Sequence, residues 1–227
     1  MWTSRAWRWV VSRLVARETY HHGQLREALV VAGLELTRAG GPTALGLRDV
    51  TRRVGVTPNA AYRHFADRES LLAAVAERIQ ADMVARMATI AAADPRDPVA
   101  DLRAVGLGYV EFALAEPGWF RTAFAMDGAP ASSRSTATAV PPPFARLVAA
   151  LDALVVAGQL PPDRRVGAEW PCWSAVHGVA VLALGGPLLG QPPEVVQAAV
   201  ERTVDAVIAG VLSEDVGAPG PLRPGRR

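Results

Sequence analysis

The segment that begins at Thr57 carries side chains with the chemistry of nucleic-acid recognition. The amide of Asn59 can pair with an adenine through two hydrogen bonds, and Arg63 supplies a positive charge. The hydroxyl of Thr57 can bind a phosphate, and a small apolar residue such as Ala61 can meet a thymine methyl group. These residue types within one short segment predict a surface that contacts a DNA duplex.

The residues around this segment predict the elements that hold it. Gly55 can adopt the left-handed conformation that ends a helix. Thr57 can cap the next helix, and Pro58 suits its first position, where no backbone N–H is needed. Asp67 is then expected to cap the helix that follows. Two short helices joined by a turn near a glycine form a helix-turn-helix, and the second, at about 58–64, is sized to enter a major groove.

This part of the chain, roughly residues 20–75, resembles the TetR family of bacterial transcriptional regulators, of the TetR/AcrR type. The matching residues are Leu47, Arg48, Asp49, Val50, Gly55, Val56, Thr57, Tyr62, His64, Phe65, Arg68, Glu69, Leu71 and Leu72. Two positions depart from the family's pattern. Gly46 stands where a Ser or Thr is common, which removes a helix cap, and Thr51 stands where Ala is common.

The resemblance also implies roles for single residues. It implies that Thr57 holds a phosphate, that Asn59 and Ala61 meet base edges, and that Tyr62, His64 and Arg68 bind the phosphate backbone. Two arginines on the preceding helix can add backbone contacts. The predicted DNA-binding residues are Arg48, Arg52, Thr57, Pro58, Asn59, Ala61, Tyr62, Arg63, His64 and Arg68. In the alternative, Tyr62 and His64 only pack, and the arginines form a solvated face.

The charge distribution fits this division of the chain. The 227 residues carry a net charge of +2, and all 24 basic residues are Arg. Residues 1–90 contain 13 Arg and 8 acidic residues, whereas residues 91–227 contain 11 Arg and 14 acidic residues. A basic first part suits DNA binding, although chance scatter would also explain it. The only cysteine, Cys172, permits no internal disulfide and is expected to be a small buried apolar residue.

Apolar periodicity predicts an all-α fold. Helices are expected at about 23–39, 47–54, 57–65, 68–92, 98–115, 119–126, 144–157, 166–185 and 193–213. The first three should form a small bundle whose core is Leu29, Leu36, Leu47, Val50, Val54, Tyr62 and Phe65. We therefore expect a helix-turn-helix DNA-binding domain at 20–67 and a larger helical ligand-binding and dimerisation domain at 68–213.

The two ends of the chain are expected to lie outside these domains. Residues 1–19 hold three Trp interrupted by Arg, a pattern that does not fit a signal peptide. They are interpreted as an over-extended start, a disordered tail, or a basic arm that touches DNA or a membrane surface. Residues 214–227 are rich in Gly, Pro and Arg and are expected to be a disordered tail. The uncharged run 170–193 is broken by Gly185-Gly186-Pro187, so a membrane span is rejected.

Two groups of residues in the second domain are candidates for ligand binding. The patch from Trp173 to Gly178 resembles the Trp…His-Gly signature of one TetR subgroup, and Trp173 and His177 share a helix face. Aromatic residues elsewhere can line an apolar pocket. The predicted ligand-binding residues are Tyr109, Phe112, Phe120, Phe124, Trp170, Trp173 and His177. In the structural alternative these residues are core, with His177 hydrogen-bonded inside it.

Enzyme chemistry is not expected. The sequence has no Gly-rich phosphate loop after a strand, no paired metal-ligand spacing and no catalytic triad pattern. A metal site formed by His21, His22 and His64 is rejected because the adjacent His21 and His22 point in different directions. No cofactor or metal is therefore predicted.

The expected function is ligand-responsive control of transcription in the cytoplasm, at the nucleoid. We expect a repressor that binds a near-palindromic operator in double-stranded DNA as a homodimer. The dimer should form through the helices at 166–185 and 193–213, and a small, mostly apolar effector should release the DNA. The alternatives are an enzyme on a helical scaffold and a membrane-associated adaptor that uses the Trp/Arg N-terminus.

Overall fold

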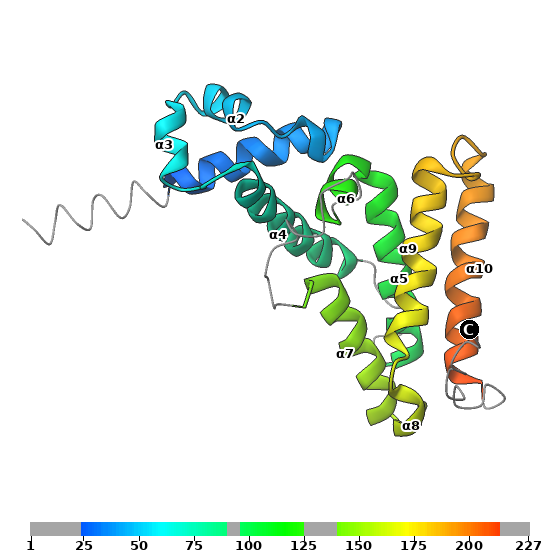
Figure 1. Ribbon diagram of the computed structural model, residues 1–227. Helices are drawn as coiled ribbons and strands as arrows, with labels where there is room; N and C mark the ends of the chain where they lie inside the picture. Colours follow the sequence, from blue (N-terminus) through cyan, green and yellow to red (C-terminus); the bar gives the residue numbers. More distant parts are fainter. Residues whose placement is uncertain (1–23, 90–95, 125–139, 214–227) are drawn as a thin grey trace, which may run out of the picture. The chain divides into compact units, whose positions relative to one another are not determined.

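The computed structural model describes residues 24–89, 96–124 and 140–213, and within these ranges it contains helices and no strand (Figure 1). The predicted all-α fold is confirmed. The described residues form two compact units. The N-terminal unit contains residues 24–79 and 117–124, and the C-terminal unit contains residues 80–89, 96–116 and 140–213. The predicted domain boundaries stay predictions, and the predicted end segments 1–19 and 214–227 lie outside the described residues.

The N-terminal unit begins with a helix at 24–40 and a short 3-10 turn. Its elements are η1 (Pro42–Ala44), α2 (Leu47–Val54), α3 (Pro58–Tyr62), the first part of α4 (Arg68–Met87) and α6 (Pro117–Ala123). Helix α2 and the start of α4 lie where the sequence predicts them. Helix α3 is shorter than the predicted 57–65. Helix α6 begins two residues before the predicted Trp119, because Pro117 takes its first position, which needs no N–H.

The core of this unit contains most of the apolar residues that the periodicity selects. Leu29, Val50 and Phe65 are buried, as predicted, and so are Leu71 and Val75 of α4. The predicted core residues Leu36, Leu47 and Val54 are only partly buried. The prediction that Tyr62 belongs to the core is wrong, because 55% of its surface is exposed.

Helix α4 ends at Met87 rather than near Ala92. The hydroxyl of Thr89 donates a hydrogen bond of 2.7 Å to the carbonyl of Arg86, and the Thr89 N–H bonds to the same carbonyl at 2.9 Å. A Thr side chain that bonds the nearby backbone competes with the next helical turn, so the helix closes in a turn at 88–89. The predicted helical residues 90–92 lie outside the described ranges.

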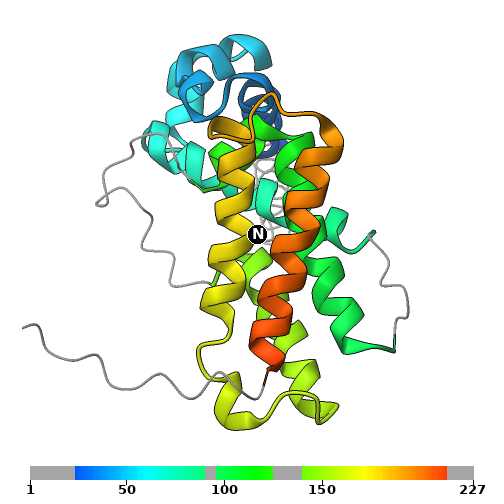
Figure 2. The same cartoon turned by 90° about the vertical axis from the view of Figure 1, so that its right-hand side faces the viewer.

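The C-terminal unit is a bundle of long helices. It contains the end of α4, α5 (Pro98–Ala115), α7 (Pro142–Val156), α8 (Pro162–Arg165), α9 (Glu169–Gly185) and α10 (Pro193–Leu212). Helix α5 packs against α7, α9 and α10, and α9 and α10 run side by side (Figure 2). The predicted helix 166–185 begins later, at Glu169, since Gly167 takes a left-handed φ of 81° just before it.

In the N-terminal unit, the backbone of α6 at Gly118 lies directly against the backbone of the first helix at Thr37 and Arg38. The indole N–H of Trp119 donates a hydrogen bond of 2.8 Å to the carbonyl of Leu34. The guanidinium carbon of Arg38 lies 5.0 Å from the centroid of the Trp119 ring. A Cβ atom added to Gly118 would lie 2.1 Å from the carbonyl oxygen of Arg38 and 2.4 Å from that of Thr37. Only a residue without a side chain fits at this contact.

We predict that Gly118→Ala lowers the free energy of unfolding by about 1–3 kcal/mol, because the methyl group must push two backbones apart. Urea unfolding followed by circular dichroism measures this change. Gly46→Ser is the control in the same unit. There the nearest atom to an added Cβ is the flexible carboxylate end of Asp49, and a serine would cap α2. Equal stability of the two variants would contradict the prediction.

Candidate nucleic-acid interface and ligand pocket

The turn between α2 and α3 is fixed by Gly55. Its φ of 78° is left-handed, and its N–H and that of Val56 both donate to the carbonyl of Thr51 at 3.0 Å. The prediction that Gly55 ends α2 is confirmed. Thr57 occupies the N-cap position of α3 and Pro58 its first position, but the Thr57 side chain makes no capping hydrogen bond. The predicted cap position is therefore confirmed, but the side-chain bond is not formed, and the Thr57 hydroxyl lies on an exposed residue.

Helix α3 exposes one face and buries the other. Pro58, Asn59, Tyr62 and Arg63 are exposed, whereas Ala61 is fully buried. A base-edge contact of the Ala61 methyl group does not fit this burial, so we correct that prediction. Because α3 has five residues, its buried side is set by the core that it covers and not by its own pattern. The exposed face carries no acidic residue within Pro58–Tyr62.

His64 follows α3 and is partly buried. Its N–H donates a hydrogen bond of 2.9 Å to the carbonyl of Ala61, and the neighbouring Phe65 is buried in the core. Arg26 covers the Phe65 ring, with its guanidinium carbon 5.1 Å from the centroid. The contact of His64 with a phosphate stays a prediction.

The arginines around α2 and α3 differ in how they are neutralised. Arg52 pairs with Asp49 and Arg53 pairs with Glu35, each at 2.7 Å. Among the described residues no carboxylate pairs with Arg48 or Arg63, and both are exposed. These two cations are therefore the ones most available to a phosphate.

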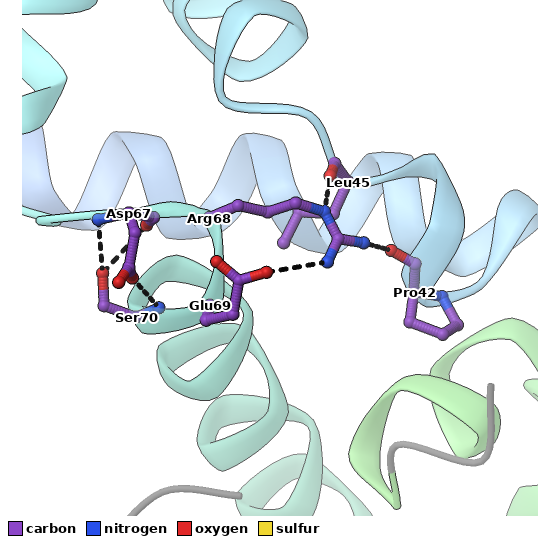
Figure 3. Close-up of polar contacts among 6 residues, drawn as sticks. All are labelled: Pro42, Leu45, Asp67, Arg68, Glu69 and Ser70. Carbon is purple, nitrogen blue, oxygen red and sulfur yellow. Dashed lines mark hydrogen bonds and ion pairs between the residues drawn. The ribbon is translucent and has the colours of Figure 1, made fainter. Parts of the chain in front are cut away.

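The Arg68 side chain extends to the backbone of the segment before α2 (Figure 3). Its Nε donates a hydrogen bond of 2.7 Å to the carbonyl of Leu45, and its Nη2 donates a shorter one to the carbonyl of Pro42. Its Nη1 lies 3.6 Å from a carboxylate oxygen of Glu69. The guanidinium is thus occupied within the protein, which does not fit the predicted phosphate contact.

Asp67 caps α4, as predicted. Its carboxylate accepts a hydrogen bond of 2.7 Å from the N–H of Ser70, and its own N–H donates to the Ser70 hydroxyl at 3.2 Å (Figure 3). These two bonds satisfy two backbone donors at once. The bonds from Ser70, first from its backbone and then from its side chain, lower the pKa of Asp67.

A pocket lies within the C-terminal unit. It is lined by apolar side chains from α4, α5, α7, α9 and α10, and its cavity volume of about 20 Å³ is little more than one water molecule needs. The lining residues are Met87, Leu102, Val105, Gly106, Tyr109, Pro143, Leu147, Cys172, Trp173, Val176, Val204, Val207 and Ile208. Cys172 is buried, as predicted, and burial raises the pKa of its thiol to about 11.

Two of the predicted ligand-binding residues, Tyr109 and Trp173, line this pocket. Their rings meet edge to face at 5.0 Å, and the Tyr109 hydroxyl is joined to Nδ1 of His177 by a hydrogen bond of 2.8 Å. Burial lowers the pKa of His177. The ring of His177 also stacks on Trp173, with an angle of 9° between their planes. His177 therefore supports two residues of the pocket wall without lining the pocket itself.

The other predicted residues lie elsewhere. Phe112 is buried, with the guanidinium carbon of Arg86 5.8 Å from its ring centroid. Phe120 and Phe124 belong to the N-terminal unit, where their rings lie 5.1 Å apart. Trp170 is 61% exposed and lies 5.3 Å from Phe144. The structure therefore does not bring the predicted aromatic set together.

Comparison with known families identifies both parts of the chain. Residues 29–75 match the family described as "Bacterial regulatory proteins, tetR family", and residues 102–207 match "Tetracyclin repressor-like, C-terminal domain". The chain belongs to the TetR family. It is therefore a DNA-binding transcriptional regulator, in which the matched N-terminal segment contains α2, the turn and α3.

Solved structures share the TetR fold. A protein of unknown function from Rhodococcus sp. RHA1 is 28% identical, with 86% of this chain and 98% of that chain covered and a TM-score of 0.68. A TetR-family transcriptional regulator from Pectobacterium atrosepticum is 23% identical over 86% of this chain and 97% of its own, with a TM-score of 0.60. A TetR variant from Acinetobacter baumannii in complex with minocycline is 22% identical over 80% and 93%, with a TM-score of 0.58. No curated protein matches the sequence.

Sequence reasoning missed the aliphatic part of the pocket. Met87, Val204 and Ile208 line it, but their periodicity is the same as that of any core residue. The available signal was Gly106, a glycine inside a helical pattern, which often marks a close approach. Across the described ranges, no three His, Cys, Asp or Glu residues gather to hold a metal ion, and His21 and His22 lie outside them. None of the described helices is long and apolar enough to cross a membrane.

Proposed function

We propose that this TetR-family regulator is a repressor that binds a near-palindromic operator as a homodimer and is released by a mostly apolar small molecule. The observation that carries the proposal is the exposed face of α3, which presents Asn59, Tyr62 and Arg63 and no acidic residue. We place the regulator in the cytoplasm, because the chromosomal DNA that it would bind lies there. The proposal includes no enzymatic activity.

The exposed face supports two kinds of contact. Asn59 is suited to read an adenine edge, which gives sequence preference. Thr57, Tyr62, Arg48 and Arg63 are suited to phosphates, which fix the register of the protein on the duplex, and neither arginine pairs with a carboxylate within the described ranges. Arg52, which is already paired with Asp49, is the weaker candidate of the arginines on α2.

We predict that Asn59→Ala relaxes sequence preference by about 1–3 kcal/mol at one base pair, whereas Arg63→Met weakens binding to every sequence. Arg63→Met should also reduce the slope of log K against log salt by about 0.9. Fluorescence anisotropy measures the affinity and its salt dependence. The DNA is the duplex that the wild type binds most tightly from a random-sequence library, together with its single-base variants. Arg103→Met, which removes an Asp205-paired cation from the C-terminal unit, is the control. Wild-type behaviour of both α3 variants would refute the assignment of this face.

The outer face of α9 and α10 supports the proposed homodimer. From Trp170 to its end, α9 carries no charged residue, and Ser174 and Leu182 are exposed on it. A Cβ atom added to Gly178, Gly185 or Gly210 would meet nothing within 4 Å. The Gly178 position is thus open in the single chain, where the same helices of a second copy can approach closely.

We predict that Gly178→Arg yields a folded monomer, because the long side chain has room in the single chain but blocks the approach of a second copy. Analytical ultracentrifugation measures the mass. The matched control is Ala149→Arg on the exposed side of α7, which should remain dimeric. A dimeric Gly178→Arg variant, or a monomeric wild type, would exclude this interface.

The pocket supports regulation by an apolar effector. All of its lining residues are apolar or aromatic, and Met87, the last residue of α4, is one of them. Helix α4 is continuous from Arg68, which follows α3, to Met87. Since the pocket is little larger than a water molecule, an effector must displace lining side chains, and a shift of Met87 moves α4. A coupling of about 1–3 kcal/mol is enough to change DNA occupancy.

We predict that Gly106→Ala weakens the response to effector and leaves DNA affinity intact. The added methyl group would lie 3.2 Å from Val204 and 3.5 Å from Val176 in the pocket wall, so it reduces the space for a ligand. Titration with N-phenyl-1-naphthylamine, an uncharged apolar fluorophore, measures occupancy, and release of DNA is followed in parallel. Leu114→Ala, on the exposed side of α5, is the control. If Gly106→Ala binds the probe and releases DNA as the wild type does, this pocket is not the effector site.

A further inference from the structure

Arg68 lies where its contacts can hold the orientation of α2 and α3 without contact with DNA. Its two carbonyl partners, Pro42 and Leu45, immediately precede α2, whereas Arg68 itself begins α4, just after α3 (Figure 3). The entire helix-turn-helix, residues 47–62, is the loop between the two ends of this contact. The Arg68 side chain thus closes that loop.

The geometry of the guanidinium argues against a phosphate role. A planar guanidinium binds a phosphate best through two parallel N–H groups on one edge. In Arg68 the edge that carries Nε and Nη2 is already used by the two carbonyls, and Nη1 faces the carboxylate of Glu69. A phosphate at this position would have to displace a carbonyl or lie beside a negative charge.

The surroundings hold the contact in place. Pro42 is buried and Leu45 is 1% exposed, so their carbonyls belong to a packed segment. The neighbouring Asp67 and Ser70 fix the first turn of α4 through their reciprocal bonds. Arg68 therefore links two segments that are each held by further contacts of their own.

We infer that Arg68 is a positioning residue that fixes the orientation of α2 and α3 for DNA binding and that it is not itself a phosphate contact. The inference rests on the proposed DNA contact of α3. Without the contact, only a fraction of molecules holds the helix pair in the competent orientation. The apparent affinity falls by that fraction, while the contacts of the molecules that do bind are unchanged.

The salt dependence of DNA binding separates the two roles. Arg68→Met keeps the apolar stem and should weaken binding by about tenfold, the effect of losing charge-assisted hydrogen bonds, with the salt slope unchanged. Arg68→Lys keeps the charge but cannot span both carbonyls, so it should weaken binding as well. Arg63→Met is the comparison, for which the slope should fall by about 0.9. The probe is the duplex selected by the wild type. A fall of about 0.9 in the slope of Arg68→Met, or wild-type affinity of Arg68→Lys, would overturn the inference.

Hydrogen exchange tests the same contact without DNA. In Arg68→Met the amides of residues 47–62 should exchange faster than in the wild type, whereas those of α5 in the C-terminal unit should not change. Arg63→Met should leave both regions unchanged. Unaltered exchange at 47–62 would refute the role of Arg68 even if DNA binding were weakened. If Arg68→Met does not fold, Arg68→Lys carries the affinity and exchange measurements, since its weakened affinity alone contradicts a phosphate role. Failure of the wild type to select any duplex would refute the proposed function, while the exchange experiment would still decide the role of the contact.

Discussion

A helix of five residues cannot hold its own shape in water, and this constraint governs the N-terminal unit. Isolated helices shorter than about 12 residues are marginal even with favourable sequences. Helix α3 therefore depends on its surroundings: the left-handed Gly55 before it, the buried Ala61 within it and the buried Phe65 after it. The same contacts that give α3 its shape leave its opposite side exposed. The face of α3 that stabilises the unit is thus opposite to the face that we propose contacts DNA.

Helix α4 contributes residues to both units. Its first turn is fixed by Asp67, Ser70 and Arg68, and its last residue, Met87, belongs to the wall of the pocket. In the proposed function, a displacement at the pocket reaches the first turn through this continuous helix of 20 residues. In the proposed function, a ligand larger than the pocket displaces lining side chains. Met87 is the lining residue that belongs to α4.

Local signals predicted the elements well. Gly55, Pro58 and Asp67 mark the ends of α2, α3 and α4 through backbone preferences that need no knowledge of the fold. The family resemblance came from the same segment, and the all-α class came from apolar periodicity along the chain. These features were accessible because each depends on residues only a few positions apart.

Several errors concern contacts that are distant in sequence. The sequence does not reveal that Arg68 bonds to carbonyls 23 and 26 residues earlier, or which side of α3 the core covers. It placed Tyr62 in the core and Ala61 on the surface, and the structure reverses both. The prediction of the pocket selected aromatic residues. Much of the lining is aliphatic, and its sequence pattern is the same as that of ordinary core residues. Tertiary packing decides each of these outcomes.

The contact at Gly118 bears on how sequences of this kind can diverge. Where α6 meets the first helix, the carbonyls of Thr37 and Arg38 occupy the volume that any side chain at position 118 would need. Substitution there demands a simultaneous rearrangement of two helices, which single mutational steps rarely supply. Homologues that retain this helix crossing should therefore keep glycine at the equivalent site, while lineages that lose it must have adopted another crossing.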